Sequence, residues 1–252
     1  MEYFTAKNSI VRKIWGSPDT VLFIFAGAAA EFAVNKAVDW LYFTGRLPAD
    51  PLGRLFSTVV YSHRIIFSEM DAANRAIDQI TAIHKTVEQN RHAQIPDWAY
   101  RDVLFMLIYY SVTSFEVLQH KLTADEKEEI FDAFYRVGMR MGLTGLPESY
   151  NDWVTAHNSH LQNDTVYSDF TTDLYKQYLK HLGYARYQIL KGVQVMIVPE
   201  KVRQMLSLGK VQFIRPLLWM YKLGRKFGLG DVVIKMILPK PYRAQVKNLQ
   251  AE

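Results

Sequence analysis

The stretch 76-AIDQITAIHKTVEQNRHAQ-94 has the alternation of apolar and charged positions that is typical of an amphipathic α-helix. Its apolar positions recur at spacings of three, four and seven residues, which is the period of one helix face. The predicted buried face consists of Ile77, Ile80, Ile83, His84 and Val87. His84 therefore stands among aliphatic side chains. Two interpretations follow: a hydrogen-bonded core histidine, or a ligand.

The segments on both sides of this helix also have helical patterns. Thr123 and Glu126 form a T-x-x-E capping box, and Gly183 separates two amphipathic segments. The alternation that indicates strands is absent over any useful length. The predicted fold class is therefore all-α, a single domain with a C-terminal extension. The predicted helices lie at about 20–34, 53–68, 70–91, 97–120, 124–142, 148–161, 168–182 and 184–197.

The longest apolar run, 20-TVLFIFAGAAAEFAV-34, is interrupted by Glu31. A membrane-spanning helix needs about 20 mostly apolar residues, so this run is predicted to be a buried helix. Gly27 and the alanines that follow it lack bulk. We expect them to let another helix, or a flat ligand, approach the backbone closely.

Charge is divided unevenly along the 252 residues. Residues 1–200 carry a net charge of −4, and residues 201–252 carry +9, because the latter hold 11 basic residues against Asp231 and Glu252. The basic segment also contains many large apolar side chains, which a solvated tail would not carry. It is interpreted as a helical hairpin that covers the core, as an interfacial helix on anionic lipid, or as a nucleic-acid patch. No nucleic-acid-binding module supports the third interpretation.

Several kinds of functional site are excluded by composition and motif. The chain has no cysteine, which excludes disulfides, thiolate zinc and iron–sulfur sites, and covalent haem. Phosphate-binding glycine loops, the G-x-S-x-G elbow and E-x-x-H pairs are absent. His157 and His160 have metal-ligand spacing, but the polar residues around them predict an exposed segment. Among metal cofactors, a non-covalent haem with His84 as its proximal ligand remains.

The line 50-DPLGRLFSTVVYSHRIIFSEMDAANRAIDQITAIHKTV-87 resembles the core of the rubber oxygenase family, which includes latex clearing proteins and mpaB-type oxygenases. The family pattern is an Asp-Pro, an Arg-Leu, a Thr four residues after the Arg, and a later histidine in an apolar setting. Here these positions are Asp50-Pro51, Arg54-Leu55, Thr58 and His84. The resemblance extends over roughly residues 12–200.

The resemblance implies a globin-like helical core that binds haem b through His84, with iron as the metal. Arg54 and Thr58 match family residues on the distal or propionate side, so Arg54 is expected to contact the cofactor, and both residues to act in catalysis. The implied function is a haem b-dependent oxygenase that uses dioxygen to cleave a C=C bond of an unsaturated apolar substrate, isoprenoid or lipid-like. The corresponding domains are a haem-binding oxygenase domain at 1–200 and a basic amphipathic extension at 201–252.

The chain departs from the family pattern at two places. Ser57 stands where rubber oxygenases can carry an iron-capping lysine, and the family's Trp-x-His is missing from 104-LFMLIYYSVTS-114. Tyr109 and Tyr110 replace that polar group or simply pack, and His63 is a conceivable distal group. A non-catalytic haem or lipid carrier or sensor, and a membrane-associated helical scaffold, therefore stay open as alternatives.

The N-terminal sequence lacks the apolar h-region of a secretory signal. The expected location is cytoplasmic, with a peripheral membrane contact through residues 201–252 as the alternative. The expected partner is a small apolar substrate, and no nucleic acid. Substrate identity and oligomeric state are not specified by the sequence.

Overall fold

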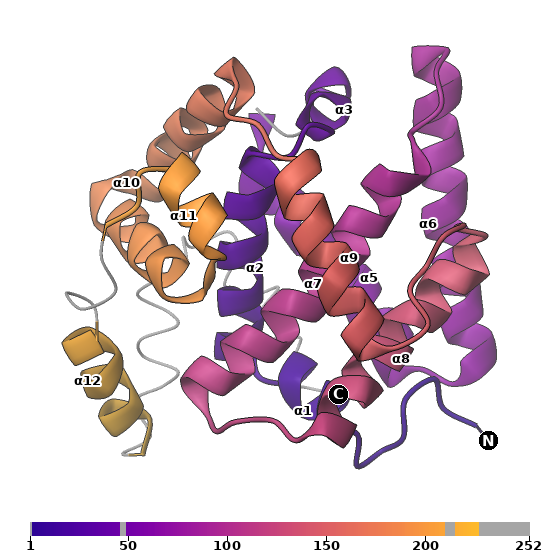
Figure 1. Cartoon of the computed structure of the whole chain (residues 1–252), viewed down its shortest axis with the longest axis horizontal. Helices are drawn as coiled ribbons and strands as arrows, with labels where there is room; N and C mark the ends of the chain where they lie inside the picture. The colour runs from indigo at the N-terminus through magenta and orange to yellow at the C-terminus, as the bar shows by residue number, and fades with distance from the viewer. Residues whose placement is uncertain (1, 46–48, 210–214, 227–252) are drawn as a thin grey trace.

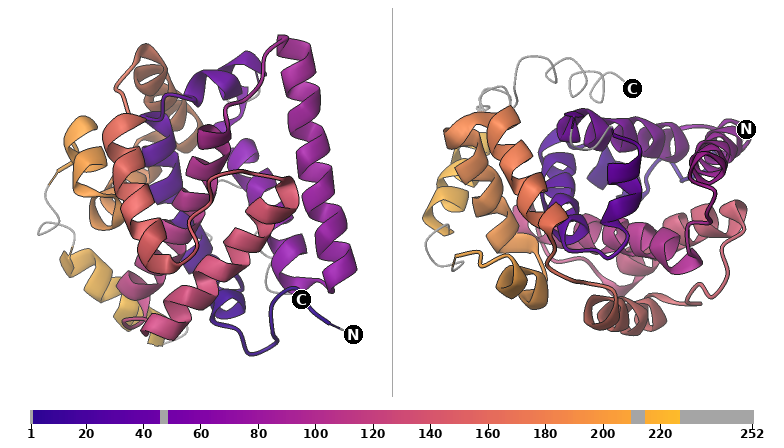
Figure 2. Two further views of the ribbon diagram at one scale, coloured as in Figure 1. Left: turned by 45° about the vertical axis from the view of Figure 1, so that its right-hand side comes forward. Right: turned by 90° about the horizontal axis from the view of Figure 1, so that it is seen from above.

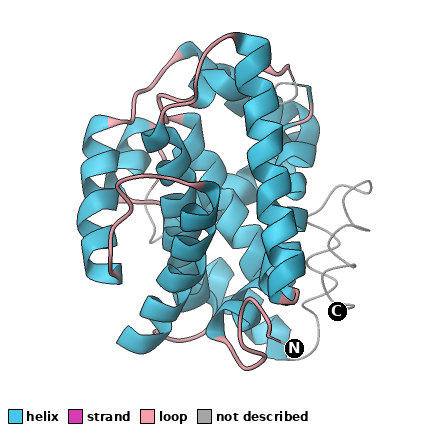
Figure 3. Ribbon diagram, turned by 90° about the vertical axis from the view of Figure 1, so that its right-hand side faces the viewer, coloured by secondary structure: helices cyan, strands magenta, loops and turns pink. Residues whose placement is uncertain are grey.

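The computed structural model describes residues 2–45, 49–209 and 215–226. Within these residues the secondary structure is helical, and the β-type pairing consists of two isolated bridges, Tyr3 with Glu69 and Asn35 with Thr165 (Figure 3). The predicted all-α fold class is confirmed. The helices are α1 (Ile10–Trp15), α2 (Pro18–Ala33), α3 (Val38–Phe43), α5 (Pro51–Phe67), α6 (Met70–Arg91), α7 (Asp97–Leu118), α8 (Ala124–Met141), α9 (Tyr150–Asn163), α10 (Asp169–Ile197), α11 (Glu200–Met205) and α12 (Arg215–Lys226).

Local chemistry explains where several helices begin and bend. The capping box predicted for α8 is present: the Thr123 hydroxyl accepts from the Glu126 backbone N–H, and the Glu126 carboxylate accepts from the Thr123 backbone N–H. Asp50 caps α5 by accepting from the Gly53 N–H at 2.9 Å. Gly183 has φ 72° and ψ 164°, which breaks the helical geometry inside α10 at the predicted point.

The middle of the molecule is occupied by α2, with α10 and α11 on one side and α7 on the other (Figure 1). The largest core cluster joins α2 to α1, α5, α6, α7, α8 and α9. The approach of α7 to α2 is close because Gly27 has no side chain: a Cβ there would lie 2.2 Å from two carbons of the Tyr110 ring. The expected role of Gly27 in close helix packing is confirmed.

The consecutive helices α5 and α6 are joined by Ser68 and Glu69 and pack against each other, with α6 at one edge of the fold (Figure 2). Arg54 lies 14 residues before Ser68, and His84 lies 14 residues after Met70. Since both helices rise equally per residue, Arg54 and His84 lie at about equal distances along their helices from this connection.

The basic C-terminal extension is described only in part. Helix α11 packs Val202 against Ala30, Val34 and Leu161 of the core, and α12 is tied to α2 by a hydrogen bond from Tyr221 Oη to Asp19 Oδ2 at 3.0 Å. Residues 210–214 and 227–252 lie outside the described residues. The predicted domain boundary at residue 200 therefore stays a prediction. In the described part of the chain, each helix is too short or too polar to span a membrane.

Candidate functional site

Arg54 and Thr58 lie on α5, and His84 lies on the neighbouring helix α6. The Arg54 guanidinium donates from Nη1 to the Thr58 hydroxyl at 2.9 Å, because residues four apart share one helix face. Its positive charge is also close enough to His84 to lower the pKa of the imidazole. All three side chains are partly buried. We refer to these three residues, which are linked by the Arg54–Thr58 hydrogen bond and by the effect of the Arg54 charge on His84, as the Arg54–Thr58–His84 cluster.

A core histidine normally has a hydrogen bond at each buried ring nitrogen, and His84 departs from this at one of them. Its Nδ1 is shielded from solvent and has no hydrogen-bond partner among the described residues. Burial, with the Arg54 charge as a second cause, lowers the pKa of His84 from 6.5 to about 4. At neutral pH the ring is therefore uncharged, which is the form that binds a metal ion.

Tyr100 and Glu88 form part of the surroundings of His84. The Tyr100 ring meets the imidazole edge-on, with ring centroids 5.1 Å apart. The Tyr100 hydroxyl donates to Glu88 Oε1 at 3.1 Å, and the same oxygen accepts from the Ile95 backbone N–H at 2.9 Å. Glu88 thus links α6 to the start of α7, which fixes the aromatic ring beside His84.

The predicted buried face of α6 is only partly correct. Ile77 is fully buried, Ile80, His84 and Val87 are half-buried, and Ile83 is 46% exposed. The reason is that α6 packs mainly on α5 and α8, and the buried residues of α6 all lie in its first half. In the second half of α6, the apolar side chains near His84 are therefore only partly covered by the neighbouring helices.

The other residues considered for this site are Ser57, which contacts Arg54, and His63 and Tyr110, which pack in the core. Ser57 is exposed and donates to the Arg54 carbonyl at 2.7 Å. His63, expected nearer the surface, is buried and stacks on Phe67 at 4.1 Å. Tyr110 is fully buried in the core, where its ring packs against Gly27. Its hydroxyl also donates a hydrogen bond to the carboxylate of Glu31.

A second group of polar side chains is buried between α2, α7 and α9. Glu31, which interrupts the apolar run of α2, is fully buried. Its carboxylate accepts from the Tyr110 hydroxyl at 2.7 Å and lies 3.1 Å from His157 Nε2. Tyr109 also reaches this region, with its ring centroid 5.0 Å from that of His157.

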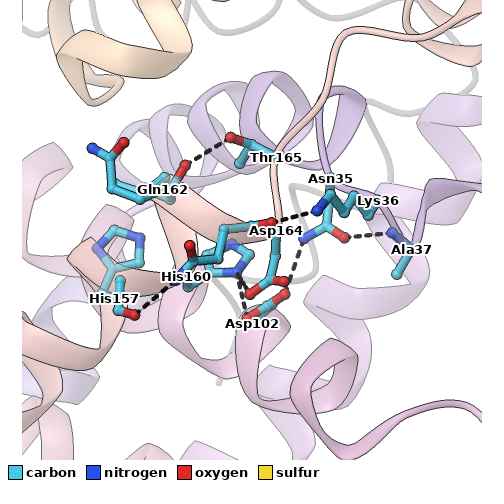
Figure 4. Close-up of polar contacts among 12 residues, drawn as sticks. Asn35, Lys36, Ala37, Asp102, His157, His160, Gln162, Asp164 and Thr165 are labelled. Atoms are coloured by element: carbon cyan, nitrogen blue, oxygen red, sulfur yellow. Dashed lines mark hydrogen bonds and ion pairs between the residues drawn. The ribbon is translucent and has the colours of Figure 1, made fainter.

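One helical turn further along α9, His160 lies between two carboxylates (Figure 4). Its Nδ1 is 2.6 Å from Asp102 Oδ1 and 3.4 Å from Asp164 Oδ2. Asn35 donates to the other oxygen of Asp102 at 3.3 Å. Although burial alone would lower the pKa of His160, the hydrogen bond and charge of Asp102 raise it above its ordinary value. We call these three residues the Asp102–His160–Asp164 cluster.

The prediction that the segment of His157 and His160 is exposed was wrong. Both imidazoles are buried, at 3% and 4% exposure. The sequence contained a signal for this: Trp153, His157, His160 and Leu161 recur at helical spacing and form the buried face of α9. The neighbouring Asn158 and Ser159 are exposed, and they masked the pattern.

The family of the chain is shown by its match to a known catalytic domain. Residues 12–223 match the model of the catalytic domain shared by the ER-bound oxygenase mpaB/B′ and rubber oxygenase. The chain belongs to this family. The suspected resemblance is thereby confirmed, and the matched region is an oxygenase-type catalytic domain that contains Arg54, Thr58 and His84. No curated protein and no solved structure matches the chain.

Proposed function

We propose that this chain is a haem b-dependent oxygenase that oxidatively cleaves a C=C bond of an unsaturated, apolar substrate of isoprenoid or lipid type. The observation that carries the proposal is His84, a shielded, uncharged imidazole with an unpartnered Nδ1 beside the Arg54 guanidinium. Family membership supports the oxygenase chemistry.

The residues present fit a haem. His84 offers the neutral imidazole that a haem iron requires, and the incompletely covered apolar side chains of α6, such as Ile83, suit the porphyrin plane. Arg54 offers a guanidinium suited to a propionate carboxylate. When bound, haem b supplies the activation of dioxygen.

The chain's own residues have three tasks in this proposal. Burial and the charge of Arg54 keep His84 unprotonated at neutral pH. Glu88 and Tyr100 restrain the setting of the imidazole ring. The Arg54 guanidinium, together with the Thr58 hydroxyl it bonds, would stabilise negative charge on oxygen, either on a propionate or on the oxygen being reduced. With serine at position 57, the chain has no lysine there to occupy the sixth iron position.

Oxygen uptake tests the proposal and separates an enzyme from a haem or lipid carrier. Haem-loaded protein is given a panel of polyisoprenes, terpenes and unsaturated fatty acids, with saturated analogues as controls. We expect dioxygen consumption and carbonyl products with at least one unsaturated compound, and a loss of roughly 10²-fold or more in Arg54→Gln. Haem binding without uptake on any compound would favour the carrier.

A second candidate function, association with an anionic membrane surface, is favoured by the orientation of α12. Trp219, Met220 and Leu223 fall on one helix face and are 65%, 63% and 41% exposed. Tyr221 anchors α12 to α2 from another side. Residues 201–252 carry a net charge of +9, which complements anionic lipid.

Liposome flotation tests this second candidate. We expect the full chain to float with anionic vesicles and not with zwitterionic ones, and Leu223→Asp to abolish flotation. Leu179→Asp is the matched control, because Leu179 on α10 is also 41% exposed. Equal flotation of both variants, or equal binding to neutral vesicles, would contradict the candidate.

A further inference from the structure

The Asp102–His160–Asp164 cluster presents donor atoms of the kind that bind metal ions. One imidazole nitrogen and one oxygen from each carboxylate all lie within 4.8 Å of one another. The 3.4 Å separation between His160 Nδ1 and Asp164 Oδ2 is close to that between neighbouring ligands of a bound first-row metal ion, whereas the 2.6 Å separation from Asp102 Oδ1 is a hydrogen bond that a bound ion would replace. His160 and Asp164 are four residues apart at the end of α9, so helix geometry places them on one side.

The charges around this cluster do not balance. Glu31, Asp102 and Asp164 are three carboxylates, and Glu31 and Asp102 are at most 2% exposed. Among the described residues, the ion pairs of these carboxylates are all with His157 or His160. Two imidazoles supply at most two positive charges, even when both are protonated. With all three carboxylates ionised, at least one negative charge is left over in a largely buried site. Burial raises the pKa of Asp102 accordingly, and a bound cation would offset the cost of the excess charge.

The surrounding chain holds the carboxylates in place and leaves an approach from solvent. Asn35 orients Asp102, and its own side-chain oxygen accepts from the Ala37 backbone N–H at 2.7 Å. The Lys36 backbone N–H donates to the Asp164 carbonyl at 2.9 Å, whereas the Lys36 ammonium is directed to the Asn163 carbonyl. The Asp164 side chain is 28% exposed, so an ion reaches the cluster from that side.

We propose that the Asp102–His160–Asp164 cluster binds one divalent transition-metal cation through His160 Nδ1, Asp102 Oδ1 and Asp164 Oδ2. A set of one imidazole and two carboxylates suits Zn²⁺, Mn²⁺, Fe²⁺ or Co²⁺, rather than Mg²⁺ or Ca²⁺, which prefer oxygen ligands alone. The bound cation links α7 to the end of α9. This site is separate from the Arg54–Thr58–His84 cluster, and the proposal does not depend on haem.

Co²⁺ titration of the full-length protein, after treatment with a chelator, tests the site directly. We expect visible d–d absorption that saturates at one Co²⁺ per chain and disappears when Zn²⁺ displaces the Co²⁺. Isothermal titration with Zn²⁺ gives the affinity without a chromophore. The melting temperature is expected to rise with Zn²⁺, because the cation binds the folded chain.

Three variants locate the ion. Asp164→Asn lies at a partly exposed helix end and keeps the side-chain shape, so it is expected to fold and to bind Zn²⁺ at least tenfold more weakly. His160→Gln is expected to lose the Co²⁺ spectrum. Asp125→Asn is the control for adventitious binding, because Asp125 belongs to an open acidic depression on α8 with Glu128, Glu129 and Asp132.

The outcomes distinguish the alternatives. Retained Co²⁺ binding in both Asp164→Asn and His160→Gln would overturn the proposal, as would loss of binding in Asp125→Asn alone. It would also be overturned if ¹⁵N NMR, recorded with excess Zn²⁺ at pH 7, showed both nitrogens of His160 protonated. His84→Ala is expected to leave Co²⁺ binding unchanged, so failure of the haem assignment and failure of this proposal are separable.

Discussion

At the scale of single residues, polar groups inside apolar helices explain most of the unusual features of this chain. Glu31 interrupts an apolar run, yet it is buried because Tyr110 and His157 satisfy its oxygens. His84 also lies on an apolar helix, but its Nδ1 has no partner in the described part of the chain. This difference separates a satisfied core group from a candidate ligand.

Gly27, the single glycine of α2, is predicted not to tolerate a side chain. In Gly27→Ala the new methyl group meets the Tyr110 ring at 2.2 Å, so α2 and α7 must move apart. We expect a loss of roughly 1–3 kcal/mol in the free energy of unfolding, measured by urea denaturation. Gly209→Ala is the control, since a Cβ there has no neighbour within 4 Å, and an equal loss in both variants would contradict the packing argument.

His84 is predicted to make stability depend on pH. Its pKa falls from 6.5 to about 4 on folding, so between these values the unfolded chain binds more protons than the folded chain. Stability is therefore lost as the pH falls from 7 to 4, by up to roughly 2–3 kcal/mol from this group. Urea denaturation at several pH values measures it in haem-free protein. His84→Gln should lower this dependence by that amount, and an unchanged dependence would show that the imidazole is not shielded.

At the scale of helices, boundaries set by local chemistry were predicted well. The capping box at Thr123 and the break at Gly183 are properties of a few neighbouring residues, and both are confirmed. The short helices α1, α3 and α11 were not predicted, since six residues show little periodicity and rely on tertiary packing. The exposure of Ile83 was missed because it depends on where the helices that neighbour α6 end.

Gly183 is predicted to be required for the bend in α10. Its φ of 72° with ψ of 164° is accessible to glycine and strained for other residues. Gly183→Ala is therefore expected to lose roughly 1–3 kcal/mol of unfolding free energy. Tyr184→Ala, at a neighbouring position that is 74% exposed, should lose much less. If the two variants are equally stable, the bend does not need glycine.

At the scale of the whole molecule, the sequence was a better guide to which residues belong to one site than to which helices cover that site. The family pattern was enough to place Arg54, Thr58 and His84 in one predicted site. The Asp102–His160–Asp164 cluster was missed because Asp102 comes from α7, and no local pattern links it to His160 and Asp164 at the end of α9. Likewise, the uneven charge of the chain indicates a basic end without identifying its partner.

The absorption spectrum of the full-length protein after haem reconstitution tests the central claim most directly. We predict a Soret band with one haem per chain in the wild type and in His120→Ala, which changes an exposed histidine, and loss of that band in His84→Ala. A wild-type protein that stays colourless, or a His84→Ala protein with an unchanged band, would contradict the account.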